Sequence, residues 1–202
     1  EFITNSGTDI TSLVTVTAVT GTTETPDGSL RKHISTIIVP SGTPGFTVEK
    51  AYNKVGWNAS DTHPLTLADA RVPQENLLGA EGRGFANFLQ ILDEGRIAIA
   101  ALATGAAQGC VDEALRYANE RTAFGTTIGS NQSIAFKIAR MQTRAHNARL
   151  AYYDAAARML AGKPFKVQAA MAKLVAGEAA MDNARDATQV FGGYGFINEF
   201  PV

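Results

Sequence analysis

Residues 82–92, Gly-Arg-Gly-Phe-Ala-Asn-Phe-Leu-Gln-Ile-Leu, mark the point at which the hydrophobic pattern of the chain changes. Four large apolar residues follow one another at the spacing i, i+3, i+4, i+7: Phe85, Phe88, Leu89 and Leu92. This spacing places the side chains on one face of an α-helix, whereas a half-buried strand would alternate apolar and polar residues. The stretch therefore predicts that a helical part begins near Gly84.

The part that precedes it has the character of antiparallel β-structure. Short runs rich in Val, Ile and Thr are separated by Pro and Gly, and Thr22 to Ser29 contains a Pro-Asp-Gly turn. The predicted strands are 13–20, 34–39, 46–50 and 65–67. We therefore predict a first domain over residues 1–80, which is an antiparallel sheet or part of a β-barrel.

After Gly84, the sequence pattern predicts three or four long helices joined by short loops. The first runs from Gly84 to about Glu120, the second begins at a capping Ser133 and reaches Ala161, and the third covers about 165–191. The seams expected to face the core are Ile134, Ile138, Met141, Ala145 and Ala148 on the second helix, and Val167, Met171, Leu174 and Val175 on the third. Alanine-rich faces with short connections predict an antiparallel bundle, of the four-helix type, over 81–202, so the fold class is α+β.

The composition excludes several classes of protein. The 202 residues are 45% hydrophobic and 18% charged, with a net charge of -1, which argues against nucleic acid as a main partner. No apolar run is long enough to span a bilayer. The single cysteine, Cys110, is expected to be a packed thiol. His33, His63 and His146 lie far apart without ligand spacing, so we predict no metal site.

Two motifs have possible chemical roles. The run Gln189-Val-Phe-Gly-Gly-Tyr-Gly-Phe196 is a glycine-rich bend, which either ends a helix or presents bare N–H groups to an anionic cofactor. In Asp93-Glu-Gly-Arg96, Gly95 costs a helix about 1 kcal/mol relative to Ala, so a close approach is one reason for it. Arg96 is flanked by apolar residues and is expected to be partly buried beside an anion.

Six ordered motifs together resemble the acyl-CoA dehydrogenase family over essentially the whole chain. They are Phe2-Ile-Thr-Asn5, with Phe where Trp is more usual, then Val72-Pro-Gln-Glu-Asn-Leu-Leu-Gly79 with Gly82-x-Gly-Phe85, then Asp93-x-Gly-Arg96, Arg121-x-x-Phe-Gly125, Gln132, and Gln189-x-x-Gly-Gly-x-Gly-Phe196. Asp93-x-Gly-Arg96 is similar to the motif of short-chain members. The resemblance implies a fragment that holds the second part of the middle β-domain and most of the C-terminal helical domain.

The resemblance also implies roles for individual residues. Those implied to contact FAD are Phe2, Ile3, Thr4, Arg121, Phe124, Gln132, Gln189, Gly192 and Gly193. Thr4 is implied to lie near flavin N5, Arg121 to meet the diphosphate and Phe124 to pack on the adenosine half. In the family, Arg121, Gln132, Gln189 and the glycines serve the FAD of a neighbouring subunit. Leu92, Asp93 and Arg96 are implied to line the acyl-CoA channel.

The implied reaction is α,β-dehydrogenation of an acyl-CoA thioester to the 2-enoyl-CoA, in fatty-acid or branched-chain catabolism. Most members take their catalytic base from a Glu loop beyond the glycine bend, and a minority place it on the helix, at the position held here by Gly95. Glu94 is one residue away, about 100° around the helix, so we assign no catalytic residue. We expect the chain as given to be inactive, and whether it binds FAD is left open.

Two alternatives to the dehydrogenase remain at this point. A flavin oxidase or monooxygenase uses the same scaffold, and a non-catalytic helical oligomerisation module would need none of the flavin residues. The implied partners are acyl-CoA, an electron-transferring flavoprotein and further copies of the chain in a homodimer or homotetramer, with neither nucleic acid nor membrane. The implied location is the cytoplasm of a bacterium or the mitochondrial matrix of a eukaryote.

Overall fold

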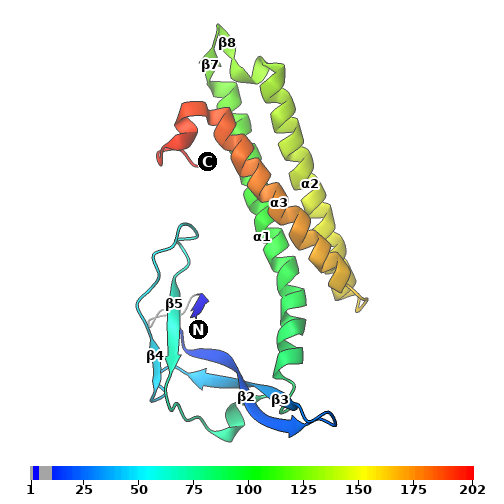
Figure 1. The fold of residues 1–202 in the computed structure, drawn as a ribbon. Helices are drawn as coiled ribbons and strands as arrows, with labels where there is room; N and C mark the ends of the chain where they lie inside the picture. Colours follow the sequence, from blue (N-terminus) through cyan, green and yellow to red (C-terminus); the bar gives the residue numbers. More distant parts are fainter. Residues whose placement is uncertain (1, 5–10) are drawn as a thin grey trace. The chain divides into compact units, whose positions relative to one another are not determined.

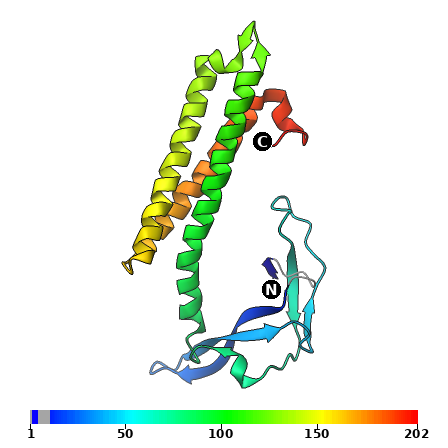
Figure 2. The same cartoon turned by 180° about the vertical axis from the view of Figure 1, so that it is seen from behind.

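The computed structural model describes residues 11–202 together with the backbone of Phe2–Thr4. Its contacts divide the chain into two compact units, the first ending at Leu89 and the second beginning at Gln90. Figures 1 and 2 show the strands in the first part of the chain and the long helices in the second. The α+β class predicted from the sequence is confirmed. Within the described residues no helix is long and apolar enough to cross a membrane.

The first unit contains two open three-stranded antiparallel sheets, with strand orders β1-β5-β4 and β2-β3-β6, which do not close into a barrel. Their strands are β1 Phe2–Thr4, β2 Leu13–Glu24, β3 Leu30–Pro40, β4 Phe46–Val48, β5 Thr62–Leu67 and β6 Leu77–Leu78, with a 3-10 turn, η1, at Gln74–Asn76. The β2–β3 hairpin is longer than predicted, because its turn is only the segment between Glu24 and Leu30. At this turn, hydrogen bonds from the Thr25 and Ser29 side chains and from the Ser29 amide lower the pKa of Asp27 to about 2.

The start of the first helix is fixed against the sheet by close packing. The buried Ser35 hydroxyl on β3 accepts a hydrogen bond of 2.9 Å from the Gly82 amide. A Cβ atom at Gly84 would lie 2.4 Å from the Ser35 carbonyl carbon, so only glycine fits there. The close backbone approach therefore occurs at Gly84. At Gly95, where it was expected, a Cβ would meet no atom within 4 Å, so that expectation was wrong for the described chain.

Three long helices, of which the first begins at the end of the first unit and continues into the second, form an antiparallel arrangement, as predicted (Figure 1). They are α1 Gly84–Glu120, α2 Gln132–Leu160 and α3 Lys166–Phe191; a small hairpin, β7 Thr122–Ala123 with β8 Thr126–Thr127, and a 3-10 turn, η2 Ile128–Ser130, join α1 to α2. Helix α2 begins at Gln132 with Asn131 at the N-cap position, and no side chain caps it, so the capping role predicted for Ser133 was wrong. Beyond α3 the chain turns into a 3-10 segment, η3 Gly192–Phe196.

The core of this unit is built largely from alanine. Fully buried alanines on all three helices include Ala100, Ala107, Ala145, Ala148, Ala169, Ala172 and Ala176. Met141, Ala145 and Ala148 are buried as predicted. The predicted seam of α3 was wrong: Val167 and Leu174 are 64% and 60% exposed, and Met171 and Val175 are exposed as well. Both the alanine stripe and this seam have helical spacing, and the small alanines permit the closer packing.

The four large apolar residues in the first turns of α1 are also exposed. Phe85, Phe88, Leu89 and Leu92 lie on α1 but are all exposed in the single chain. The seam of α3 formed by Val167, Met171, Leu174 and Val175 is likewise exposed among the described residues. Exposed apolar surface of this extent is typical of faces that contact another protein surface.

Candidate functional site

The glycine-rich bend after α3 forms one wall of a cavity of about 550 Å³. We name this cavity the glycine-bend pocket; it is lined by Tyr117, Arg121, Ile128, Val190, Phe191, Gly192, Gly193, Tyr194 and Ile197. Three residues singled out from the sequence, Arg121, Gly192 and Gly193, are therefore brought together where α1 and α3 end. The remaining lining is mostly apolar and aromatic, which is typical of ligand sites with a few placed polar groups.

The bend itself depends on glycine. Gly192 ends α3 with φ 59°, a left-handed conformation that favours glycine. A Cβ atom at Gly192 or Gly193 would meet no atom within 4 Å, so the backbone at both positions borders open space. Gly195 is different, because a Cβ there would lie 2.5 Å from the Thr188 carbonyl oxygen. The first two glycines thus leave room for a ligand, and the third permits internal packing.

Aromatic residues position the cationic side of the pocket. The Arg121 guanidinium carbon lies 5.7 Å from the centre of the Tyr194 ring. The Arg121 amide donates a 2.9 Å hydrogen bond to the Tyr117 carbonyl, one turn earlier on α1. Tyr117 stacks on Phe191 at 4.1 Å between ring centres. Tyr117 and Tyr194 were not singled out from the sequence, although Tyr117 precedes Arg121 by four residues and Tyr194 interrupts the glycines.

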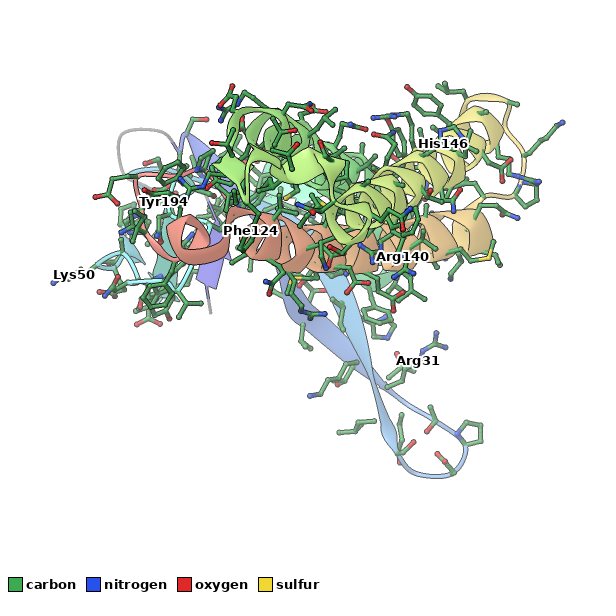
Figure 3. All side chains as sticks on the ribbon, turned by 90° about the horizontal axis from the view of Figure 1, so that it is seen from above. Arg31, Lys50, Phe124, Arg140, His146 and Tyr194 are labelled. Carbon is green, nitrogen blue, oxygen red and sulfur yellow. The ribbon has the colours of Figure 1, made fainter. Side chains whose placement is uncertain are left out.

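Phe124 occupies an unusual position at the tip of the β7–β8 hairpin. Its side chain is fully exposed and its φ is 53°, which is rare for a bulky residue. Together with Gly125 at φ 82°, it forms the two-residue turn of the hairpin. Figure 3 labels Phe124 and Tyr194 in a view from above. A fully exposed phenylalanine in a strained turn indicates a contact outside this chain.

Among the described residues proposed for the cofactor, Gln132, Gln189 and Phe124 do not line the glycine-bend pocket. Gln132, at the start of α2, and Gln189, in the last turn of α3, are both exposed. The side chains of Phe2, Ile3 and Thr4 lie outside the described residues; only their backbone is placed, as β1 beside β5. Cys110 is partly buried against the cluster around Tyr117, and burial raises the pKa of its thiol, as expected of a packed cysteine.

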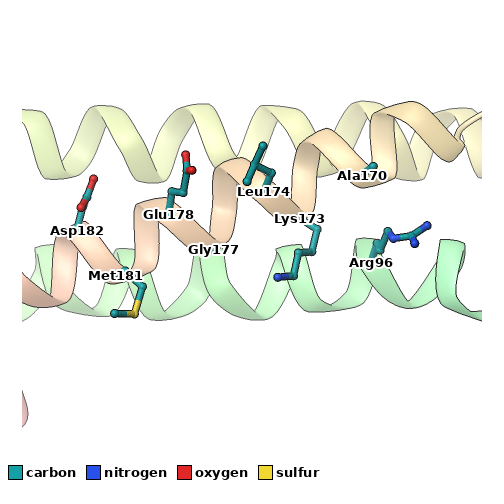
Figure 4. A pocket seen from close by; sticks show the side chains of 8 residues that line it. All are labelled: Arg96, Ala170, Lys173, Leu174, Gly177, Glu178, Met181 and Asp182. Atoms are coloured by element: carbon teal, nitrogen blue, oxygen red, sulfur yellow. The ribbon is translucent and has the colours of Figure 1, made fainter.

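The Asp93–Arg96 motif lies on α1, far from this pocket. The Asp93 carboxylate accepts a hydrogen bond from Arg96 and lies 4.0 Å from the Lys166 ammonium, so Arg96 is half-buried beside an anion, as expected. Arg96 lines a second cavity of about 750 Å³, the Arg96 pocket, with Ala170, Lys173, Leu174, Gly177, Glu178, Met181 and Asp182 from α3 (Figure 4). Leu92 is 40% exposed and does not line it.

The Asp93–Arg96 motif and Arg121 lie far apart along the axis of α1. From Arg96 to the end of α1 at Glu120 the helix rises about 36 Å at 1.5 Å per residue. The Asp93–Arg96 motif and Arg121, which directly follows α1, therefore lie at well-separated levels of the same helix. Among residues 11–202 and the β1 backbone, no group of three His, Cys, Asp or Glu side chains could hold a metal ion.

Comparison with known proteins gives a consistent result. Residues 82–202 match the model of the C-terminal domain of acyl-CoA dehydrogenases. The chain is 43% identical, over its whole length and 51% of the relative, to the short-chain-specific acyl-CoA dehydrogenase of Megasphaera elsdenii. It superposes with a TM-score of 0.90 and 41% identity on butyryl-CoA dehydrogenase from Megasphaera elsdenii, over 99% of this chain and 50% of that chain. The same TM-score and identity hold for a chain in a solved structure of the electron-transferring flavoprotein of Acidaminococcus fermentans, with 99% and 51% covered. The chain thus spans about half the length of the proteins it matches.

Proposed function

The chain belongs to the acyl-CoA dehydrogenase family, and from this premise we propose that it supplies the helical part of an FAD-dependent enzyme that oxidises short acyl-CoA thioesters to 2-enoyl-CoA. The observation that carries the proposal is the convergence of Arg121, Gly192 and Gly193 on one pocket. The short-chain assignment rests on the names of the relatives.

The glycine-bend pocket suits a flavin dinucleotide by its donors and by its space. Arg121 offers a planar guanidinium, which matches a diphosphate with two parallel hydrogen bonds. The backbone at Gly192 and Gly193 is open on the side where a Cβ would lie, so phosphate or ring atoms can approach it closely. When bound, FAD supplies the acceptor for the hydride that leaves the β-carbon of the substrate.

The residues of this chain position FAD and the thioester ligand, and none is assigned as the catalytic base. In the proposed enzyme Arg121 holds the diphosphate, Gly192 and Gly193 let the backbone reach it, and Gln132 and Gln189 add hydrogen bonds. Phe124 covers the adenosine half. Asp93 and Arg96, which pair with each other, fix the orientation of the thioester ligand beside α1.

The separation along α1 supports a site shared between subunits. One chain presents its cofactor residues at one end of the helix and its substrate motif about 36 Å away, by the rise of 1.5 Å per residue. Leu92, Met171 and Leu174 are exposed apolar residues that a second copy would cover. We therefore propose a homo-oligomer, with an electron-transferring flavoprotein as the acceptor, as the relative in the Acidaminococcus structure suggests.

The proposal is tested on the full-length enzyme by FAD titration and by oxidation of butyryl-CoA with an artificial electron acceptor. We expect Arg121→Gln to weaken FAD binding by about tenfold or more, because a charge-assisted pair is lost. Arg185→Gln is the matched control, since it removes one exposed charge from α3 outside the pocket. Equal FAD affinity of the two variants would contradict the proposal. Rapid reoxidation of the reduced protein by oxygen would favour an oxidase instead.

A further inference from the structure

A third cavity, between α2 and α3, gathers positive charge that the proposed reaction does not use. It measures about 310 Å³ and is lined by Ser133, Phe136, Lys137, Arg140, Arg144 and Asp186; we name it the basic pocket. Three cationic side chains and one carboxylate line it, and a second carboxylate, Asp182 on α3, lies 3.9 Å from the Arg144 guanidinium. None of these residues lines the glycine-bend pocket or the Arg96 pocket.

Two of the cations are fixed in place by the carboxylate. The Lys137 ammonium donates to one oxygen of Asp186 at 2.8 Å, and the Arg144 guanidinium donates to the other oxygen at 2.7 Å. Asp186 is only 18% exposed. Both of its oxygens are therefore engaged, and its single charge is divided between two cations.

Arg144 is held further by a buried amide. Its guanidinium also donates to the Asn183 side-chain oxygen at 3.1 Å. Asn183 is completely buried, and its amide donates to the carbonyls of Ala107 on α1 and Met141 on α2. The cationic wall of the basic pocket is thus anchored to all three helices and is preorganised for a ligand.

Arg140 has no such partner. Within the part of the chain that the structure describes, it makes no hydrogen bond or ion pair, although on α2 it comes between Lys137 and Arg144, which are both held by Asp186. Figure 3 labels Arg140 on α2. An ammonium carries three donors and a guanidinium five, so the pocket offers many more donors than its one carboxylate can accept. Arg140 is exposed, so its donors are open to a ligand, and an anion with several oxygen acceptors would match them.

We propose that the basic pocket binds a phosphate group, either free or as the monoester of a small aromatic molecule. A phosphate dianion supplies the acceptors for Arg140 and for the remaining donors of Lys137 and Arg144, and Ser133 adds a hydroxyl. Phe136 lines the pocket and is 59% exposed, so its ring provides a surface on which an aromatic ester can stack. The proposal does not depend on the proposed function.

The test is a titration with sodium phosphate at low, constant ionic strength, followed through the side-chain Nε–H resonances of the arginines. We expect saturable binding with a Kd on the order of 1 mM and a shift of the Arg140 signal. Arg140→Gln should weaken binding by about tenfold or more, whereas Arg185→Gln, the same charge loss outside the pocket, should change it less than about twofold. Equal effects of the two variants, or no saturation, overturn the proposal.

A second arm distinguishes the two sources of phosphate. Adenosine monophosphate is titrated against the native protein and against Phe136→Ala. Tighter binding of this nucleotide than of phosphate, lost in the variant, assigns the site to an aromatic phosphate ester, and equal affinities assign it to inorganic phosphate. Arg140→Gln must weaken both ligands, and retention of either at full affinity contradicts the proposal. The FAD titration of Arg121→Gln tests the proposed function separately.

Discussion

The Arg121 guanidinium lies over the ring of Tyr194, with 5.7 Å between the guanidinium carbon and the ring centre. The contact joins the residue that follows α1 to the bend that follows α3. Tyr194 is itself held by Phe200 at 4.8 Å, and Phe200 contacts Phe191 at 5.8 Å. The position of the cation in the glycine-bend pocket therefore depends on an aromatic cluster.

Tyr194→Leu should loosen Arg121 without removing its charge. An exposed cation–π contact contributes about 1 kcal/mol, so we expect FAD affinity to fall about fivefold. Tyr194→Phe keeps the ring and should bind FAD like the native protein. The measurement is FAD titration by quenching of flavin fluorescence, and a loss in the Phe variant equal to that in the Leu variant would show that the hydroxyl matters instead.

Phe124 has a strained backbone and a fully exposed side chain. A substitution there should therefore affect the free energy of unfolding and the FAD affinity in opposite directions. Phe124→Asn should raise the free energy of unfolding by about 1 kcal/mol, because Asn tolerates φ 53° better than a bulky aromatic residue does. The same change should weaken FAD binding, since the proposed contact with the adenosine half is lost. Urea unfolding and FAD titration check the two effects. A variant that is stabilised and binds FAD normally would remove Phe124 from the cofactor site.

The sequence predicted the elements of this fold well where a local signal exists. The change of period at Gly84 and the glycine at 192 set the limits of α1 and α3, because spacing and left-handed φ are properties of neighbouring residues. The packing of α3 was not predictable in this way. Ala169 and Leu174 belong to two stripes of the same period, and only contact with α1 and α2 decides which is buried.

The candidate sites, like the packing of α3, depend on contacts between segments that are distant in the sequence. Arg121 and Gly192 could be connected through the resemblance to a family, but their meeting in one pocket depends on the antiparallel return of the chain. Tyr194 occupies an unspecified position of the glycine-rich run and Arg140 belongs to no motif, so both become candidates only through what lies beside them in space. The buried Asn183 looks from the sequence like an ordinary polar residue of an exposed helical face.

Asn183 links three helices, so its loss should destabilise the second unit. Asn183→Ala leaves the carbonyls of Ala107 and Met141 without their side-chain donor and removes a partner of Arg144. We expect the free energy of unfolding to fall by about 3 kcal/mol. Asn147→Ala, at an exposed position of α2, is the control and should change it by less than about 0.5 kcal/mol. The urea midpoints of the two variants provide the comparison, and similar midpoints would contradict the linking role.

Asp186 should make stability depend on pH in the acid range. Burial raises the pKa of this carboxyl, but hydrogen bonds and charges from Lys137 and Arg144 on α2 outweigh burial and hold the pKa below its usual value. Arg140 faces the same pocket, and Asp182 and Arg185 lie on the same helix. Because the folded pKa is depressed, the unfolded chain binds more protons as pH falls, so this contribution is present above about pH 4 and is lost below it. Asp186→Asn should therefore destabilise the protein at pH 7 and much less at pH 3, measured as free energies of unfolding in urea. A difference between the native protein and the variant that is the same at both pH values would show that the carboxylate charge contributes nothing.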